Sequence, residues 1–179
     1  MIWRHFQPRA DVLRRAALLG VVAGLRSQLP FALLALAARR GKFAADARLP
    51  LGLLRSRGVL AVCGLAALGE QIGDKLPIVP SRLALAPFGG RLLIGSLAGA
   101  AICGDAGQPA VAGALLGLAG AGAGAVAGYG ARTLLGRATG IADPLLGVAE
   151  DCVAVALGLK AIAGIAGIEE RRAAATPAR

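Results

Sequence analysis

The sequence predicts an all-α, polytopic transmembrane helical bundle with four or five spans, and three observations support this prediction. First, 56% of the 179 residues are apolar, only 17% are charged, and the mean hydropathy is +0.68. Second, the apolar residues are grouped in five stretches, and the cations lie mainly between them. Third, many of the 27 glycines recur at four-residue spacing, which is typical of helices that pack closely in lipid. Since soluble domains carry about 25% charged residues and about 7% glycine, we expect a single integral membrane domain over residues 1–179.

Five apolar stretches account for the predicted helices. They are residues 16–38, 58–76, 92–104, 110–131 and 145–168. A bilayer core about 30 Å thick requires roughly 20 helical residues, and only 110–131 reaches this length without a charge. The alternative is a soluble, alanine-rich bundle, which needs a polar face on every helix. The stretch 110–131 offers no such face, so the sequence favours the membrane.

The first stretch is interrupted at Arg26-Ser27-Gln28-Leu29-Pro30, and Pro30 is expected to break the helix there. It is either a kinked full span or a re-entrant hairpin, since residues 16–25 supply only about 15 Å of helix. The re-entrant alternative, which we favour, places a polar N-terminal arm (1–15) and a basic loop (39–57) on one face. The positive-inside rule assigns that face to the cytoplasm. Residues 1–24 lack a cleavage site for a signal peptide and are expected to be retained.

Prolines also flank two of the later apolar stretches. Pro77 follows the second stretch and Pro144 precedes the fifth, and both are expected to be helix breaks. A polar C-terminal tail covers residues 169–179.

Ionisable residues near the centres of apolar stretches form the candidate site. Each costs about 3 kcal/mol or more at the bilayer centre, so such residues are expected to be paired or functional. The economical arrangement pairs Arg26 and Arg132 with Glu70 and Glu150 in the bundle interior. This set is either a structural salt-bridge network or a polar site near the midplane for an ion, a proton or an anionic headgroup. Its members are Arg26, Glu70, Asp74, Lys75, Arg91, Arg132, Glu150 and Asp151.

A glycine run and an internal echo suggest how the helices pack. Gly120, Gly124 and Gly128 would lie on one helix face, where small residues permit close packing within the chain or, as the alternative, a homo-oligomer seam. Residues 20–27 are echoed at 124–133, and an acidic residue follows each copy. If all five stretches cross the membrane, this echo predicts an inverted repeat; the alternative is chance similarity of Ala- and Gly-rich helices.

Several function classes are excluded by what the sequence lacks. The net charge is +10, but few aromatic residues accompany the basic ones, so anionic lipid headgroups explain these cations better than nucleic acid does. The lone His5 lies in the polar arm, and no nucleophile–base set can be formed, so we expect no enzyme. Cys63, Cys103 and Cys152 are expected to be small buried hydrophobes, and neither a metal nor a cofactor is expected.

Three sequence blocks together resemble a known family. They are Ala23-Gly24-Leu25-Arg26 with Pro30, then Glu70-x-x-x-Asp74-Lys75-x-Pro77, then Arg132 with Asp143-Pro144 and Glu150-Asp151. Their order and spacing are similar to domain-of-unknown-function family 4126 over about residues 13–165. The resemblance implies a small multi-pass protein of the bacterial inner membrane, without an established activity. Tyr129-Gly130-Ala131 departs from that pattern, where a His and a Lys are expected.

Two functional hypotheses follow. The first is a small transporter or channel-like protein, in which arginines attract an anionic group and carboxylates hold a coupling proton or orient the arginines. The second is a non-transporting membrane scaffold, in which the same charges lock the helices together. The substrate is not indicated by the sequence.

Overall fold

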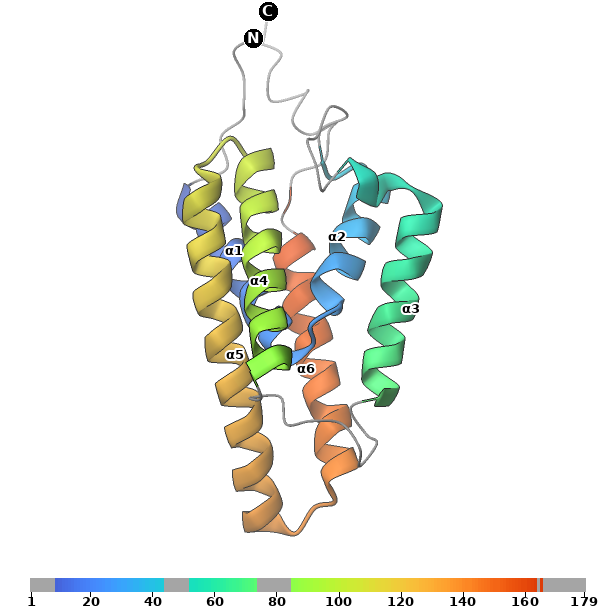
Figure 1. The fold of residues 1–179 in the computed structure, drawn as a ribbon, viewed down its shortest axis with the longest axis vertical. Coiled ribbons are helices and arrows are strands. Elements are labelled where there is room, and N and C mark those ends of the chain that lie inside the picture. The colour runs from blue at the N-terminus through green and yellow to red at the C-terminus, as the bar shows by residue number, and fades with distance from the viewer. Residues whose placement is uncertain (1–8, 44–51, 74–84, 164, 166–179) are drawn as a thin grey trace, which may run out of the picture.

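A computed structural model describes residues 9–43, 52–73, 85–163 and 165, and within these ranges the chain is helical without strands (Figure 1). The elements are α1 (Arg9–Leu25), α2 (Leu29–Arg39), a short 3-10 helix η1 (Leu53–Arg55), α3 (Arg57–Gly73), α4 (Leu85–Asp105), α5 (Ala110–Thr139) and α6 (Asp143–Ala163). The predicted all-α class is therefore confirmed. Asp74, Lys75, Pro77 and the tail 169–179 lie outside the described residues.

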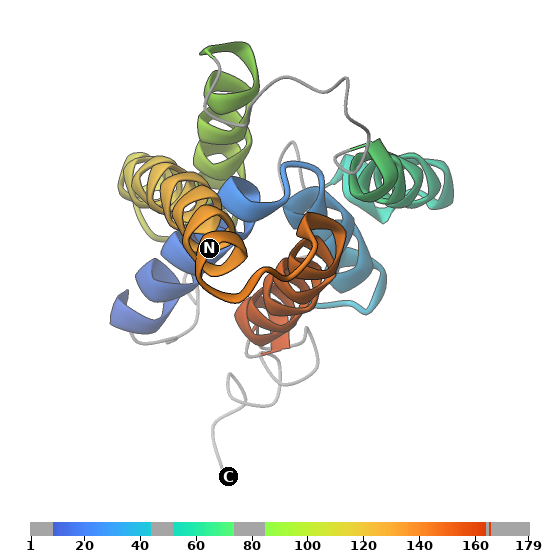
Figure 2. The same ribbon diagram turned by 90° about the horizontal axis from the view of Figure 1, so that it is seen from below.

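The first apolar stretch is broken at the predicted place. α1 ends at Leu25, and α2 begins at Leu29 with Pro30 in its first turn, where a missing N–H costs nothing. α2 then returns toward the end of the bundle at which α1 began (Figure 1). The two short helices thus form a hairpin whose turn lies inside the bundle, surrounded by other helices in the end-on view (Figure 2).

α1 is the central element of the bundle. It contacts α4, α5 and α6, and residues along its length, such as Val12, Leu19 and Val22, are fully buried. α3 packs against α2 and η1 instead, so it lies at the periphery (Figure 2).

Glycines permit α1, α4 and α5 to pack backbone to backbone. A Cβ placed on Gly20 would lie 2.2 Å from the carbonyl oxygen of Gly117, and one placed on Gly124 would lie 2.4 Å from that of Val21. Between α4 and α5, a Cβ on Gly99 would lie 2.2 Å from the oxygen of Gly113. These distances are too short for any side chain, so the three helices can approach this closely only at glycine.

The order of these contacts also gives the helix directions. Gly20 meets Gly117 while Gly24 meets Ala121, so α1 and α5 run parallel. The inverted repeat was conditional on all five stretches crossing, which would make these two segments antiparallel. The parallel direction of α1 and α5 does not support an inverted relation between these two segments, and the repeat itself remains a prediction.

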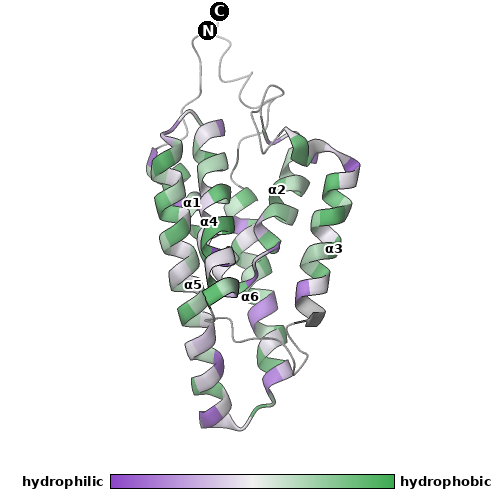
Figure 3. Ribbon diagram, viewed as in Figure 1, coloured by the Kyte–Doolittle hydropathy of each residue, from purple (hydrophilic) through white to green (hydrophobic). Residues whose placement is uncertain are grey.

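The outer surface of the bundle is apolar. Large hydrophobic side chains such as Leu65, Leu93 and Leu115 are exposed, while hydrophilic positions gather at helix ends and in the bundle interior (Figure 3). Among the described helices, α4 and α5 are long and apolar enough to cross a membrane. α6 has the same length as α4 but carries Asp143, Glu150, Asp151 and Lys160.

The glycine contacts generate a prediction about stability. Gly124→Ala places a methyl group against the backbone of α1, whereas Gly130→Ala, in the same helix, has no neighbour within 4 Å of the new Cβ. We expect Gly124→Ala to destabilise the protein by about 1–3 kcal/mol through overpacking and Gly130→Ala to cause no loss. Thermal unfolding of the two purified variants measures the difference. Equal midpoints would contradict close α1–α5 packing.

Candidate functional site

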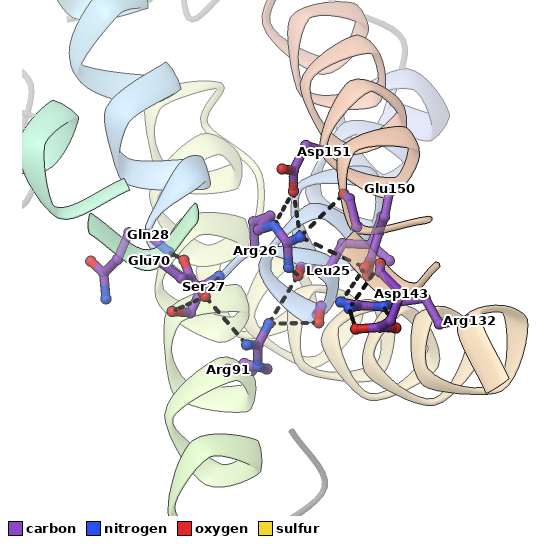
Figure 4. A network of polar contacts seen from close by, with 12 residues as sticks. Leu25, Arg26, Ser27, Gln28, Glu70, Arg91, Arg132, Asp143, Glu150 and Asp151 are labelled. Carbon is purple, nitrogen blue, oxygen red and sulfur yellow. Dashed lines mark hydrogen bonds and ion pairs between the residues drawn. The ribbon is translucent and has the colours of Figure 1, made fainter. Parts of the chain in front are cut away.

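A continuous ionic network surrounds the break between α1 and α2 in the bundle interior and extends to Asp143, whose side chain is 69% exposed (Figure 4). Its charged members include three arginines and four carboxylates, contributed by the α1–α2 connection and by α3, α4, α5 and α6. They are Arg26, Arg91, Arg132, Glu70, Asp143, Glu150 and Asp151. Asp74 and Lys75, which the sequence also placed in the candidate site, lie outside the described residues.

Arg26 connects the helix break to α6. Its side chain is only 1% exposed, which for an arginine requires partners on every side. The guanidinium forms a close ion pair with Asp151 and lies 3.7 Å from Glu150. It also donates to the carbonyl oxygens of Leu25 at 3.2 Å and Gly147 at 3.5 Å. The arginine therefore binds the end of α1 to the second turn of α6.

Arg91 of α4 binds the open C-terminus of α1. Its Nη1 donates to the carbonyl oxygens of Gly24 at 2.9 Å and Leu25 at 3.1 Å. The last carbonyls of a helix lack intrahelical donors and carry partial negative charge, so a cation there is favourable. Arg91 is 4% exposed, so this interaction takes place away from solvent.

Glu70 of α3 binds the open N-terminus of α2. Its carboxylate accepts hydrogen bonds from the backbone N–H groups of Ser27 and Gln28, both at 2.8 Å, and from the Ser27 hydroxyl at 2.9 Å. Gln28, the N-cap residue, makes no side-chain capping bond of its own. Glu70 thus supplies from another helix the anion that a helix N-terminus favours. Arg91 Nη2 lies 3.3 Å from Glu70 Oε1 and joins the two caps.

Arg132 and Glu150 join α5 to α6. Arg132 forms a close, two-pronged ion pair with Asp143, and its Nη1 lies 3.5 Å from Glu150 Oε2. Glu150 therefore lies between Arg26 and Arg132, and its side chain is 8% exposed. Gly128 provides room for it, because a Cβ on Gly128 would lie 2.6 Å from Glu150 Oε1.

The ion pairs of the network differ from those predicted from the sequence at one carboxylate, Glu70. Glu150 does contact both Arg26 and Arg132, whereas Glu70 contacts Arg91 rather than either of them. Arg91 directly precedes the third apolar stretch, but α4 begins six residues before it, at Leu85, so Arg91 lies within the helix and in the interior. Gly128 also differs from Gly120 and Gly124, since its nearest contacts are Glu150 and the Leu25 side chain rather than the backbone of α1.

Sequence reasoning missed three participants in the network. Asp143 was named only as part of the family motif and not as a site residue, but it is the first residue of α6, and Pro144 follows in the first turn. Ser27 and Gln28 were treated as the interruption itself, yet their N–H groups are the donors to Glu70. The sequence held one signal for Ser27 and Gln28: a broken helix leaves backbone N–H groups without helical partners, and these groups require acceptors when they are buried.

The fold and the site together define a small helical protein built around a broken helix with a buried ionic centre. A family model described as Domain of unknown function (DUF4126) matches residues 14–164. Because this match spans most of the chain, the protein belongs to that family, as the sequence motifs predicted. No curated protein and no solved structure gives a significant match to the chain.

The central ion pair generates a prediction about folding. Arg26→Gln removes a fully buried cation and leaves the part-buried Asp151 without its closest cation, so we expect a loss of about 3 kcal/mol or more in the free energy of unfolding. Combining it with Asp151→Asn removes both charges and is expected to restore part of the loss, with a coupling of about 1 kcal/mol or more. Unfolding curves for the single and double variants measure this coupling. Arg137→Gln, an exposed change at the end of α5, is the control. Additive losses would contradict a direct Arg26–Asp151 interaction.

Proposed function

We propose that this protein is a multi-pass membrane protein in which α3, α4, α5 and α6 cross the bilayer and the α1–α2 hairpin is re-entrant. Support comes from the two helices of membrane-spanning length and from the apolar outer surface. α3 has 17 residues and α6 has 21, which correspond to about 26 Å and 32 Å of helix. The charges of α6 that lower its hydropathy belong largely to the interior network. The family resemblance extends the proposal to the bacterial inner membrane.

The distribution of cations supports one orientation. Arg14, Arg39, Arg40 and Arg57 are among the basic residues at the end of the bundle where α1 begins and α2 ends. We propose that this end faces the cytoplasm, because cytoplasmic loops carry an excess of Lys and Arg. Basic groups at this end would contact anionic lipid headgroups.

We further propose that the protein is a small transporter or channel-like protein whose functional centre is the ionic network. The observation that supports this most directly is the pair of open helix ends at Leu25 and Leu29, held by Arg91 and Glu70. Discontinuous helices inside a bilayer expose backbone dipoles that bind ions and charged substrates, and many transporters use them for that purpose. A bundle that needed only stability would be served by an unbroken apolar helix.

The network would lie on one side of the midplane, displaced from it toward one membrane face. Arg91 is six residues from the start of α4, and Glu150 is seven residues from the start of α6, so about 10 Å of helix separates each from that end. From Arg91 to the other end of α4 the helix continues for about 21 Å. The shorter path is on the side opposite the basic end, which we propose is the extracytoplasmic side.

In this proposal the arginines attract an anionic group and the carboxylates carry a proton. Glu70 and Glu150 each pair with an arginine, so protonation of either acid would weaken a cap or a bridge and release a guanidinium toward an incoming anion. Proton binding and opening of the centre would thereby be coupled. The proposal involves no catalytic step, no cofactor and no nucleic acid.

The alternative function is a non-transporting membrane scaffold. The observation that favours it is the mutual pairing of the network, in which guanidinium groups and carboxylates link α1, α3, α4, α5 and α6. The glycine run does not favour an oligomer seam, because Gly120 and Gly124 face α1 within the chain. The exact number of spans and the internal repeat remain predictions. Because α1 and α5 run parallel, a repeat that relates them would have both copies in the same orientation rather than inverted.

Proton flux separates the two functions. We expect the wild type in pyranine-loaded phosphatidylcholine liposomes to dissipate an imposed pH gradient, and Glu70→Gln and Glu150→Gln to reduce this flux to that of empty liposomes. Asp11→Asn is the matched control, because Asp11 is a carboxylate at the opposite end of the bundle, paired with Arg14 and Arg15. Circular dichroism establishes that each variant is folded. No flux in the wild type, together with unfolding of both glutamine variants, would support the scaffold instead.

Topology can be tested by cysteine labelling. The native cysteines are replaced, and single cysteines are introduced at Arg9 and at Arg40. In sealed inside-out vesicles, whose cytoplasmic face is outside, both are expected to react with a membrane-impermeant maleimide. A cysteine at Thr139, between α5 and α6, is expected to react from the other side. Labelling of Arg9 and Arg40 from opposite sides would rule out the re-entrant hairpin.

A further inference from the structure

A small groove lies between the C-terminal ends of α2 and α6, at the basic end of the bundle and away from the ionic network. Its volume is about 140 Å³, and it is lined by Ala37, Arg40, Lys42, Leu159, Ile162 and Ala163. Among these described side chains, four are aliphatic and two are cationic. The groove therefore combines an apolar wall with a positively charged rim.

The end of α2 fixes the two cations beside the groove. Gly41 adopts a left-handed backbone with φ of +69°, and its N–H donates to Ala38 at 3.2 Å while the N–H of Lys42 donates to Ala37 at 3.0 Å. This is the glycine-dependent Schellman arrangement that ends many helices. Phe43, the next residue, is 1% exposed and packs in the core, so the chain is anchored on both sides of Lys42.

Arg15 of α1 lies near the end of α6 but is not part of the groove lining. Arg15 of α1 reaches α6 and donates to the carbonyl oxygen of Ala161 at 3.0 Å, but it is held by an ion pair of 2.6 Å with Asp11. Arg40 and Lys42 belong to the lining itself. An occupant that is apolar along α6 and anionic at the end of α2 would match this lining.

We propose that this groove binds one anionic phospholipid, with an acyl chain against Leu159, Ile162 and Ala163 and the headgroup phosphate at Arg40 and Lys42. The inference rests on the membrane residence proposed above and on charge complementarity. The basic end is the one assigned to the cytoplasm, and the cytoplasmic leaflet is rich in anionic lipid. A bound lipid would join the end of the re-entrant hairpin to the end of α6, which carries Glu150 and Asp151 lower down.

Retention of lipid by the purified protein tests the proposal. The intact protein in detergent micelles is titrated with phosphatidylglycerol or with phosphatidylcholine of the same chain length, and bound lipid is counted by native mass spectrometry. We expect one phosphatidylglycerol to be retained in preference to phosphatidylcholine. Arg40→Gln is expected to weaken its binding by about fivefold, as one headgroup contact is lost.

Two further variants separate the groove from general surface attraction. Arg39→Gln removes the same charge one residue away, at a side chain that does not line the groove, and is expected to leave the affinity unchanged. Ala163→Phe retains every charge but fills the groove, and is expected to abolish retention. Thermal unfolding monitors whether both variants are folded.

Three outcomes would overturn the proposal. Equal weakening by Arg39→Gln and Arg40→Gln would indicate diffuse attraction, and equal retention of phosphatidylcholine would indicate an apolar surface only. Displacement of the lipid by inorganic phosphate would indicate a site for a free anion. If the protein remained dissolved and monomeric without detergent, membrane residence itself would be contradicted, a failure distinct from the other three.

Discussion

The structure depends on the ionic capping of a helix break inside an apolar bundle. Where α1 stops and α2 starts, backbone carbonyl and N–H groups lose their helical partners, and burial makes each such loss costly. Arg91 supplies donors to one helix end, Glu70 supplies acceptors to the other, and the two side chains contact each other. Because these residues come from α4 and α3, the break also determines how those helices are placed. The remaining ion pairs extend the same arrangement to α5 and α6.

Close packing and the ionic centre impose complementary constraints on α5. Gly120 and Gly124 bring its backbone against α1, while one turn further on Gly128 leaves space for Glu150. Arg132 follows after another turn and meets both Glu150 and Asp143. One helix face thus changes from a packing surface into the wall of the polar centre. A side chain at any of these glycines would disturb the spacing on which the pairs rely.

Local chemistry made part of this arrangement predictable from sequence. The break at Arg26–Pro30 follows from a charge and a proline in an apolar stretch. Arg26 and Arg132 were expected to pair with Glu70 and Glu150 because unpaired charges are costly in an apolar interior. The partner of Glu70 was not predictable, since it depends on where α4 begins and how α3 is rotated. Asp143 was missed because a residue beside a proline resembles a simple helix boundary. Helix rotation and depth are set by tertiary packing and leave little trace in composition or spacing.

Amide hydrogen exchange at the helix break tests the capping most directly. In the wild type the N–H groups of Ser27 and Gln28 are bonded to Glu70, so they are expected to exchange slowly when observed residue by residue by NMR in micelles. Glu70→Leu removes the acceptor and is expected to accelerate exchange at these two amides while those in the middle of α5 remain protected. Equal exchange rates at Ser27 and Gln28 in the two proteins would contradict the claim that a carboxylate from α3 holds the start of α2.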